Sequence, residues 1–247
     1  MDGIRGAGAV LRDIRHVAET GSTNADMMAL AAAGVAEGVW LRADRQTAGR
    51  GRQGRAWESP LGNLYASMLV RMRASDPQAA TLALVAAVAL DEAVRVFAPH
   101  LSAELAIKWP NDLLIDGAKL TGILLERSGD AVVIGMGVNL VHHPDALDRP
   151  TTSLAAHGVT VDPAPFLDTL ADIFASWLTH WRSEGLARVR ARWIERAHPK
   201  GTALSARSGD GAVIEGLFDG LDDHGALILR LAGGGRHVMH AGDVFLI

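Results

Sequence analysis

The residues best suited to chemistry lie in one short stretch, Gly49-Arg50-Gly51-Arg52-Gln53-Gly54-Arg55, which Trp57 follows closely. Glycine leaves the backbone mobile, and each guanidinium group is permanently charged, with a fork of N–H donors that matches phosphate or carboxylate oxygens. If the stretch is extended, Arg50 and Arg52 point to the same side, because side chains alternate along an extended chain. We interpret residues 49–55, called the arginine loop below, as a phosphate-binding loop.

The glycines of the arginine loop also spell G-x-G-x-x-G, the pattern of a dinucleotide-binding turn. That turn needs a strand before it and a helix that begins at its third glycine. Residues 45–48 lead into the loop, residues 57–63 lead out of it, and no helix is predicted there. We therefore reject the dinucleotide-binding interpretation. A solvated basic loop that contacts nucleic-acid phosphates stays open, and the loop alone supports it as well as it supports a small-molecule phosphate.

The composition excludes several classes of function. The 247 residues are 49% hydrophobic with a net charge of -4, which is typical of a globular protein rather than of one with a basic nucleic-acid-binding face. The absence of cysteine excludes disulfides, zinc–thiolate sites and a thiol nucleophile. We find no signal peptide and no apolar run long enough to span a membrane. His142, His143 and His180 lack the spacing of metal ligands. We expect a cytoplasmic protein without membrane contact or a metal site.

Polar side chains near the loop are candidate ligand contacts. A helix is predicted over residues 24–33, and Ser22 and Thr23 stand at its start, where a hydroxyl caps free backbone N–H groups. One cap suffices, so the other hydroxyl and Asn24 are available for a polar ligand group. Gln46 precedes the loop and is a further candidate, with an ordinary surface amide as the alternative.

A second group of chemical residues surrounds Pro110. Residues 106–115 have the composition of a strand, but proline cannot donate to a sheet ladder. We predict a strand broken by a rigid kink, from which Lys108 and Asp112 face a cavity. The alternative, about equally supported, is a turn in which Asn111 and Asp112 bond their own backbone.

Two further predicted strands carry charge and glycine. Lys119 begins the apolar run 120–126, after a hairpin signal at Asp116-Gly117. A lysine at the mouth of a buried strand is a candidate functional charge, although lysine tips also reach water in ordinary strands. Gly122, inside this run, removes a side chain where something approaches closely.

Residues 132–140 are predicted to form the next strand. Gly135, Gly137 and Asn139 are two apart and therefore share a face, which leaves a floor without side chains that ends in an amide. Such a floor fits a planar or fused-ring ligand; the alternative is close packing of a helix on the sheet.

The other elements are predicted to be structural. Strands are expected at residues 13–20, 39–43 and 63–70, helices at 81–97, 166–181 and 186–197, and short strands at 203–205, 213–218, 226–231 and 244–247. The last four predict a small β-barrel that begins near Lys200.

Taken together, the motifs resemble the biotin protein ligase family. They occur in the family's order over most of residues 20–140, and several long motifs in order are far more specific than one alone. The final strands resemble the family's small Src-homology-3-like domain. The matching segments are residues 21–24, Gln46 with residues 49–55 and Trp57, and residues 59–65, 108–112, 119–126 and 135–139.

The resemblance implies an α+β fold of the class II synthetase-like biotin/lipoate ligase type. A mixed β-sheet packed with helices would occupy residues 1–199, and a Src-homology-3-like β-barrel residues 200–247. It also implies an ATP-dependent, AMP-forming enzyme: biotin and MgATP give biotinyl-5′-AMP, and a lysine of a biotin carboxyl carrier protein, the acetyl-CoA carboxylase subunit, then takes the biotinyl group.

The resemblance also implies roles for individual residues. The catalytic residues would be Lys119, Arg52, Asp112 and Lys108. Biotin would contact Ser22, Thr23, Asn24, Gln46, Gly49, Arg50, Gly51, Arg52, Lys119, Gly122, Gly135 and Gly137. ATP would contact Arg52, Arg55, Trp57, Lys108, Asn111, Asp112, Lys119 and Asn139. The arginine loop would order over the adenylate and exclude water.

Some expectations concern what the chain departs from or lacks. Gly21 stands where many relatives carry an acidic residue. About twenty residues precede Ser22, fewer than a helix-turn-helix domain needs, so we expect no specific DNA binding. A homodimer is allowed, and the oligomeric state is left open. The alternatives are a lipoate or octanoate protein ligase, and an RNA-binding module, which would lack an aromatic stacking platform because the chain has few aromatic residues.

Overall fold

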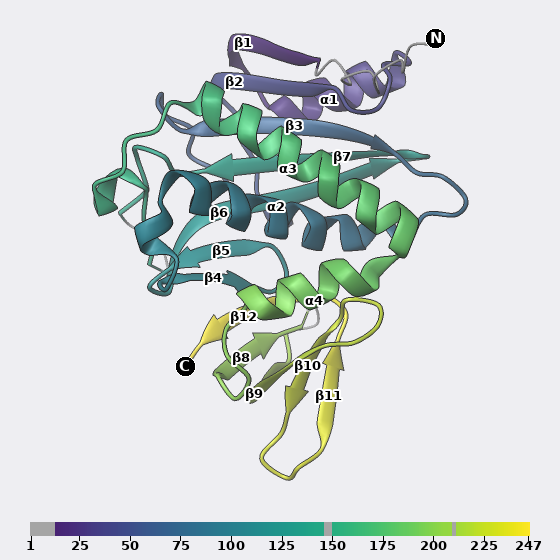
Figure 1. Ribbon diagram of the computed structural model, residues 1–247, viewed down its shortest axis with the longest axis vertical. Coiled ribbons are helices and arrows are strands. Elements are labelled where there is room, and N and C mark those ends of the chain that lie inside the picture. Colours follow the sequence, from purple (N-terminus) through teal and green to yellow (C-terminus); the bar gives the residue numbers. More distant parts are fainter. Residues whose placement is uncertain (1–12, 146–149, 209–210) are drawn as a thin grey trace, which may run out of the picture.

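The computed structural model describes residues 13–145, 150–208 and 211–247. Its larger sheet contains β1 (Ile14–Thr20), β2 (Trp40–Gln46), β3 (Leu64–Arg71), β4 (Leu105–Lys108), β5 (Asp112–Ile115), β6 (Ala118–Ser128) and β7 (Ala131–Val138). The strand order is β1-β2-β3-β7-β6-β5-β4 (Figure 1). Strands β1 and β2 are parallel and the other pairs are antiparallel, so the sheet is mixed, as predicted.

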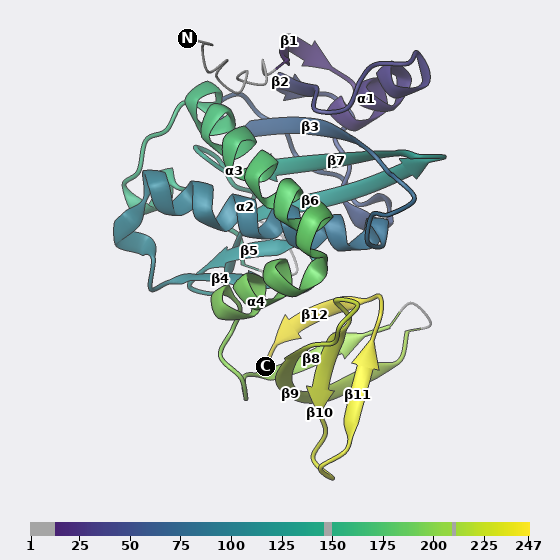
Figure 2. The ribbon, with the colours of Figure 1, turned by 45° about the vertical axis from the view of Figure 1, so that its right-hand side comes forward.

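Helices cover both faces of this sheet. The helices are α1 (Thr23–Ala32), α2 (Leu82–Phe97), α3 (Pro163–Glu184) and α4 (Leu186–Arg196). The α2 and α3 helices pack on one face, and α1, which connects the parallel strands, packs on the other (Figures 1 and 2). The α2 helix is buried along most of its length, which explains its nearly uniform apolar sequence. Among the described residues, no helix combines the length and apolar character that crossing a membrane requires.

The C-terminal segment forms a second sheet, antiparallel and five-stranded, that lies beside α4 (Figure 2). Its strand order, β11-β10-β9-β8-β12, is consistent with the predicted Src-homology-3-like fold. The division between residues 199 and 200 falls between α4 and the first of these strands and stays a prediction. The strands are β8 (Ala203–Arg207), β9 (Val213–Leu221), β10 (Leu227–Arg230), β11 (Arg236–Met239) and β12 (Asp243–Leu246).

Strand β11 is absent from the sequence-based prediction. The strand has only four residues, Arg236-His237-Val238-Met239, two polar and two apolar, and in the described part of the chain it pairs with β10 alone. An edge strand of this kind has no buried face along most of its length, so no apolar alternation marks it.

The prediction of one kinked strand over residues 106–115 is wrong. The chain reverses at Trp109-Pro110-Asn111, and β4 pairs antiparallel with β5, with Lys108 opposite Asp112. The Trp109–Pro110 peptide bond is cis, a geometry found in tight turns. The chain turns here, as in the alternative, but Asn111 and Asp112 bond Ile123, Arg52 and two lysines and not their own backbone. The reversal brings Lys108 and Asp112 together, and both line the cavity as expected.

An ion cluster fastens α3 to the sheet. Glu37 precedes β2 and accepts hydrogen bonds from both terminal nitrogens of Arg182, at 3.0 and 2.8 Å, and from Arg73 at 2.8 Å. The Arg182 guanidinium lowers the pKa of Glu37 to about 2, although partial burial opposes this shift. The carboxylate is thus held ionised at any ordinary pH.

The stability that Glu37 contributes is expected to depend on pH. Because its folded pKa is depressed, the contribution is fully present above the ordinary pKa of 4.5 and is lost as pH falls toward about 2. Glu37→Gln should therefore lower the free energy of unfolding by about 2 kcal/mol at pH 7, allowing for partial solvent screening. Chemical denaturation of both proteins between pH 7 and pH 3 tests this. An equal difference at every pH would contradict the assignment.

Candidate active site

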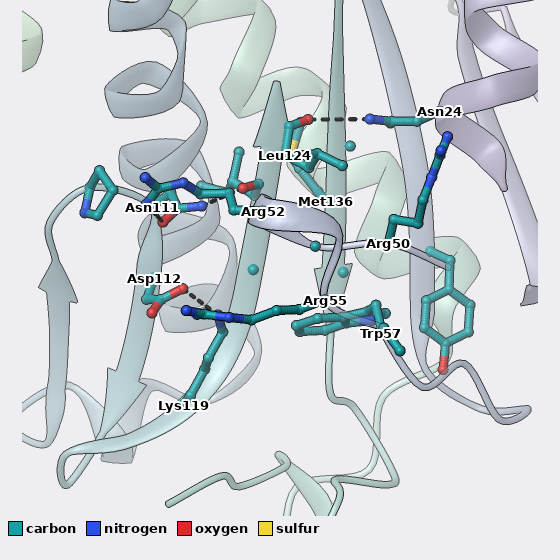
Figure 3. A pocket seen from close by; sticks show the side chains of 18 of the residues that line it. Asn24, Arg50, Arg52, Arg55, Trp57, Asn111, Asp112, Lys119, Leu124 and Met136 are labelled. Carbon is teal, nitrogen blue, oxygen red and sulfur yellow. Dashed lines mark hydrogen bonds and ion pairs between the residues drawn. The ribbon is translucent and has the colours of Figure 1, made fainter. Parts of the chain in front are cut away.

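One cavity collects nearly all the residues singled out from the sequence (Figure 3). It lies where the N-terminus of α1, the arginine loop, the β4–β5 turn, β6, β7 and the start of β12 meet. The predicted site residues that line it are Ser22, Thr23, Asn24, Gln46, Arg50, Gly51, Arg52, Arg55, Trp57, Lys108, Asn111, Asp112, Lys119, Gly122, Gly135 and Gly137. Of the predicted set, Gly49 and Asn139 do not line it.

The arginine loop folds back on itself instead of running extended. The Gly51 N–H donates to the Arg55 carbonyl at 2.8 Å, and Gln53, in a single 3-10 turn, has a left-handed φ of 58°. Arg50 consequently points to one side of the loop and Arg52 to the other (Figure 3). The expectation that these two side chains share a side is therefore wrong, because period-two alternation holds only in extended chain.

Each loop arginine meets an acidic or polar partner. Arg50 lies 4.0 Å from a carboxylate oxygen of Glu126, on β6. Arg52 donates to Asn111 Oδ1 at 3.4 Å, and Arg55 donates to Asp243 Oδ2 at 2.6 Å. The loop thus bridges the larger sheet and the C-terminal sheet, and it brings guanidinium groups to the rim of the cavity.

A buried carboxylate sits between two lysines at the opposite wall. Asp112 Oδ1 lies 2.5 Å from Lys119 Nζ, and Asp112 Oδ2 lies 3.2 Å from Lys108 Nζ. All three side chains are at most 10% exposed. Lys119 is also directed over the Trp57 ring, 5.6 Å from its centroid, whereas Lys108 donates to the Val244 carbonyl at 3.0 Å. Both lysines line the cavity, Lys119 beside Trp57 and Lys108 beside the C-terminal sheet.

Uncharged side chains that hydrogen-bond to one another form a further wall of the cavity. Ser22 caps α1, since its hydroxyl accepts from the Ala25 N–H at 3.5 Å. Gln46 Oε1 accepts from both the backbone N–H and the hydroxyl of Thr23, at 2.9 and 3.1 Å, and Gln46 Nε2 donates to Ser59 at 3.1 Å. These partners fix the Gln46 amide in orientation, so it is more than a surface amide.

The glycine floor makes room for two side chains of the protein itself. A Cβ at Gly137 would lie 2.6 Å from Trp57 Cε2, and one at Gly122 would lie 2.8 Å from Trp57 Cζ3. A Cβ at Gly135 would lie 2.3 Å from Asn24 Oδ1. The floor therefore accommodates the Trp57 indole and one amide from α1, which agrees with the close-packing alternative; a ligand on this floor stays a prediction.

Gly135→Ala is expected to destabilise the fold. Asn24 cannot easily move away from an added methyl group, because Asn24 Oδ1 accepts from Ser67 at 2.6 Å and Asn24 Nδ2 donates to Glu126 at 2.8 Å. We expect the free energy of unfolding to fall by about 1–3 kcal/mol, the usual cost of overpacking. Chemical denaturation measures this. Gly21→Ala, which adds a methyl group with nothing within 4 Å, is the matched control and should leave stability nearly unchanged.

Comparison with known proteins decides the family. Residues 34–139 match the biotin/lipoate A/B protein ligase family, and residues 205–247 match the biotin protein ligase C-terminal domain. A biotin–[acetyl-CoA-carboxylase] ligase of Paracoccus denitrificans is 43% identical over 93% of this chain and 98% of its own length. The chain belongs to the biotin protein ligase family.

Solved structures of other biotin protein ligases share the fold. The enzyme of Aquifex aeolicus, in complex with biotin and ATP, superposes with a TM-score of 0.85 over 96% of this chain and all of that one, at 24% identity. The enzyme of Leishmania major, in complex with biotinyl-5-AMP, gives a TM-score of 0.66 over 93% of this chain and 99% of that one, at 25% identity.

Two predicted site residues of this ligase lie outside the cavity. Asn139 is buried, and its side-chain amide donates to the Thr152 carbonyl at 3.0 Å. Gly49 lies at the root of the arginine loop, where a Cβ would come within 2.6 Å of the Trp57 carbonyl oxygen and 2.8 Å of Ser59 Oγ. In this structure Gly49 thus permits close approach of two chain segments.

Some residues of the ligase cavity were missed from the sequence. Tyr65 lines it, and its hydroxyl donates to the Pro60 carbonyl at 2.7 Å; burial raises the pKa of this phenol. Tyr65 belongs to the matching segment 59–65, and this membership is the sequence signal that could have identified it. Asp243 and Val244 also line the cavity, and they come from the C-terminal sheet, where no motif marks them.

Proposed function

We propose that this ligase activates biotin with ATP to biotinyl-5′-AMP and transfers the biotinyl group to a lysine of a biotin carboxyl carrier protein of acetyl-CoA carboxylase. The observation that carries the proposal is the division of one cavity into a cationic wall and a neutral polar wall. The Paracoccus relative carries the corresponding name, and the Leishmania relative is in complex with biotinyl-5-AMP.

The cationic wall suits the first half-reaction. A biotin carboxylate and a triphosphate repel each other, so positive groups must hold both and stabilise charge that builds up at the α-phosphate. The carboxylate oxygen attacks the α-phosphorus, the bond to the bridging oxygen breaks, and pyrophosphate leaves with its electron pair. Two carboxylates, Asp112 and Asp243, line the cavity beside five cationic side chains, which are Arg50, Arg52, Arg55, Lys108 and Lys119.

The neutral wall suits the biotin end. The fused rings of biotin would be bound by Ser22, Thr23 and Gln46 and by the backbone of Arg50 and Gly51. Uncharged donors and acceptors match this ring system because it is itself uncharged. The Thr23–Gln46 pairing supports this, since it leaves the amide in a defined orientation toward the cavity. Gly122 and Gly137 would provide space for flat groups.

Magnesium is proposed to enter with the nucleotide. Among the described residues, no group of three histidine or acidic side chains is arranged to hold a metal ion. The carboxylate nearest the expected phosphates, Asp112, is paired with two lysines. This donor set does not fit a resident divalent cation, and triphosphate oxygens commonly supply the ligands of Mg²⁺.

Binding is expected to require movement of Trp57 and the arginine loop. The cavity volume is about 90 Å³, whereas pockets for drug-sized ligands have volumes of about 300–1,000 Å³. The Trp57 indole occupies the space above Gly122 and Gly137. A loop that moves aside for the substrates and then closes again would exclude water from the mixed anhydride.

The second half-reaction follows from the first product. The lysine amine of the carrier attacks the carbonyl carbon of biotinyl-5′-AMP, an amide forms, and AMP leaves while the amine loses a proton. The carrier protein is therefore the proposed macromolecular partner. That the protein can form a homodimer, and that it does not bind DNA specifically, both stay predictions.

One assay tests the activity. Pyrophosphate release should depend on biotin together with MgATP, and lipoate or RNA should not replace biotin. Label from radioactive biotin should then appear on a carrier domain of acetyl-CoA carboxylase. Release that follows lipoate instead of biotin would overturn the proposal in favour of lipoate ligation, and RNA binding without pyrophosphate release would overturn it in favour of a binding module.

A further inference from the structure

The start of β12 contacts two of the three loop arginines that line the cavity. The Asp243 carboxylate is 2.6 Å from Arg55 Nη2 and 3.7 Å from Arg52 Nη1. The Gly242 carbonyl accepts a hydrogen bond from Arg52 Nη2 at 3.2 Å. The Asp243 side chain is 15% exposed, whereas the side chains of Arg52 and Arg55 are 29% and 50% exposed, so the carboxylate is shielded from water more than its partners are. Charge-assisted hydrogen bonds are shorter and stronger than those between neutral groups.

The same strand also contacts the lysine wall. The next residue, Val244, accepts a hydrogen bond from Lys108 Nζ at 3.0 Å through its carbonyl. Consecutive residues of β12 therefore contact cations that come from the arginine loop and from β4. These contacts join the C-terminal sheet directly to the candidate active site.

The sheet fixes the position of Asp243. Asp243 pairs with Arg207 of β8 in the antiparallel ladder. The preceding Gly242 packs so closely that a Cβ would lie 2.5 Å from the Arg207 carbonyl oxygen and 2.8 Å from the Met239 sulfur, and its φ is +156°. The carboxylate is thus presented by a fixed edge, whereas the loop it contacts is glycine-rich.

We propose that Asp243 is a positioning residue, which keeps the arginine loop closed over the cavity by holding Arg52 and Arg55. Asp243 acts through these arginines and not on the reacting atoms. The C-terminal sheet thereby sets the geometry of the adenylation site. This inference rests on the proposed function for its kinetic consequences, but closure of the loop itself can be measured without any substrate.

Loop closure is tested with trypsin, which cleaves after arginine. We expect Asp243→Asn to increase the initial rate of cleavage after Arg50, Arg52 and Arg55 by about threefold to tenfold in the absence of substrate, as befits loss of one partly shielded charge-assisted contact. Mass spectrometry of the fragments identifies the cleaved bonds. The apparent KM for ATP should rise by a similar factor, while the apparent KM for biotin should stay unchanged.

Two further variants make the result specific. Asp219→Asn removes a carboxylate of the same sheet whose ion-pair partners are Lys200 and Arg236 and not loop arginines, and it should leave loop cleavage unchanged. Asp243→Glu keeps the charge and should restore part of the protection.

Equal cleavage of Asp243→Asn and the wild-type protein would overturn the inference, as would a lower KM for ATP, which would show that Asp243 competes with phosphate. If the wild-type loop resists trypsin and Asp243→Asn removes this resistance, but the wild-type protein releases no pyrophosphate in response to biotin, only the proposed function is overturned.

Discussion

Replacing Arg52 with alanine is expected to release biotinyl-5′-AMP into solution, where it labels unrelated lysines. In the structure the Arg52 guanidinium contacts Asn111 and the Gly242 carbonyl, so it ties the arginine loop to two walls of the cavity. Loss of these contacts and of the proposed contact with the adenylate should raise the off-rate of biotinyl-5′-AMP by about tenfold or more, since each hydrogen bond to a charged group contributes about 1.5–3 kcal/mol. The mixed anhydride then acylates exposed amines without the carrier.

Two measurements check this expectation. The off-rate of preformed biotinyl-5′-AMP is measured by competition with excess unlabelled adenylate, and stray labelling is measured on a bystander protein such as serum albumin. Arg45→Ala is the matched control, because Arg45 is an exposed arginine of β2 whose ion-pair partner among the described residues is exposed Glu19, at 3.5 Å. An unchanged off-rate in the Arg52 variant would count against the role of the loop as a cover.

Replacing Lys119 with methionine is expected to slow adenylate formation by about 10²–10³-fold, the usual effect of removing one preorganised group that stabilises transition-state charge. Lys119 faces the cavity beside Trp57, with its ammonium group 2.5 Å from Asp112. Methionine keeps most of the side-chain length and packing but removes the charge.

A comparison with Lys108→Met tests which of the two lysines stabilises the charge that builds up at the α-phosphate. Lys108 is directed at the Val244 carbonyl, so Lys108→Met should slow adenylate formation less and should lower the free energy of unfolding more. Single-turnover pyrophosphate release measures the first effect and chemical denaturation the second. When supplied with synthetic biotinyl-5′-AMP, the Lys119 variant should biotinylate the carrier at a rate close to that of the wild-type protein. Equal slowing by both substitutions would contradict this assignment.

The expectation for Arg52 and the proposal for Asp243 share one physical basis, the position of the arginine loop between the larger sheet and the C-terminal sheet. Glu126 of the larger sheet faces Arg50, and Asp243 of the C-terminal sheet faces Arg52 and Arg55. Carboxylates on both sides hold the cations near the cavity before any phosphate arrives. Each guanidinium group has five N–H donors, so a triphosphate can bind to donors that the carboxylates leave free while the carboxylates keep the loop in place.

Local sequence was enough to predict most of the larger sheet and its helices. Apolar periodicity identified α2 and α3, and Gly34, with a left-handed φ of +87°, ends α1 as its position predicted. The Asp116-Gly117 signal produced the β5–β6 hairpin, where both residues have positive φ. Such features depend on residues that are neighbours in the chain, so a single sequence contains their cause.

The sequence also determined which residues would meet, but not how they would meet. Motifs scattered over residues 20–140 converge on one cavity, as the resemblance implied. The structure alone decided that Arg50 and Arg52 diverge, that Pro110 lies in a chain reversal which pairs Lys108 with Asp112, and that Asp243 reaches the loop across 188 positions of sequence. These outcomes depend on packing and charge pairing between segments that lie far apart in the chain, and no local periodicity or turn signal carries that information.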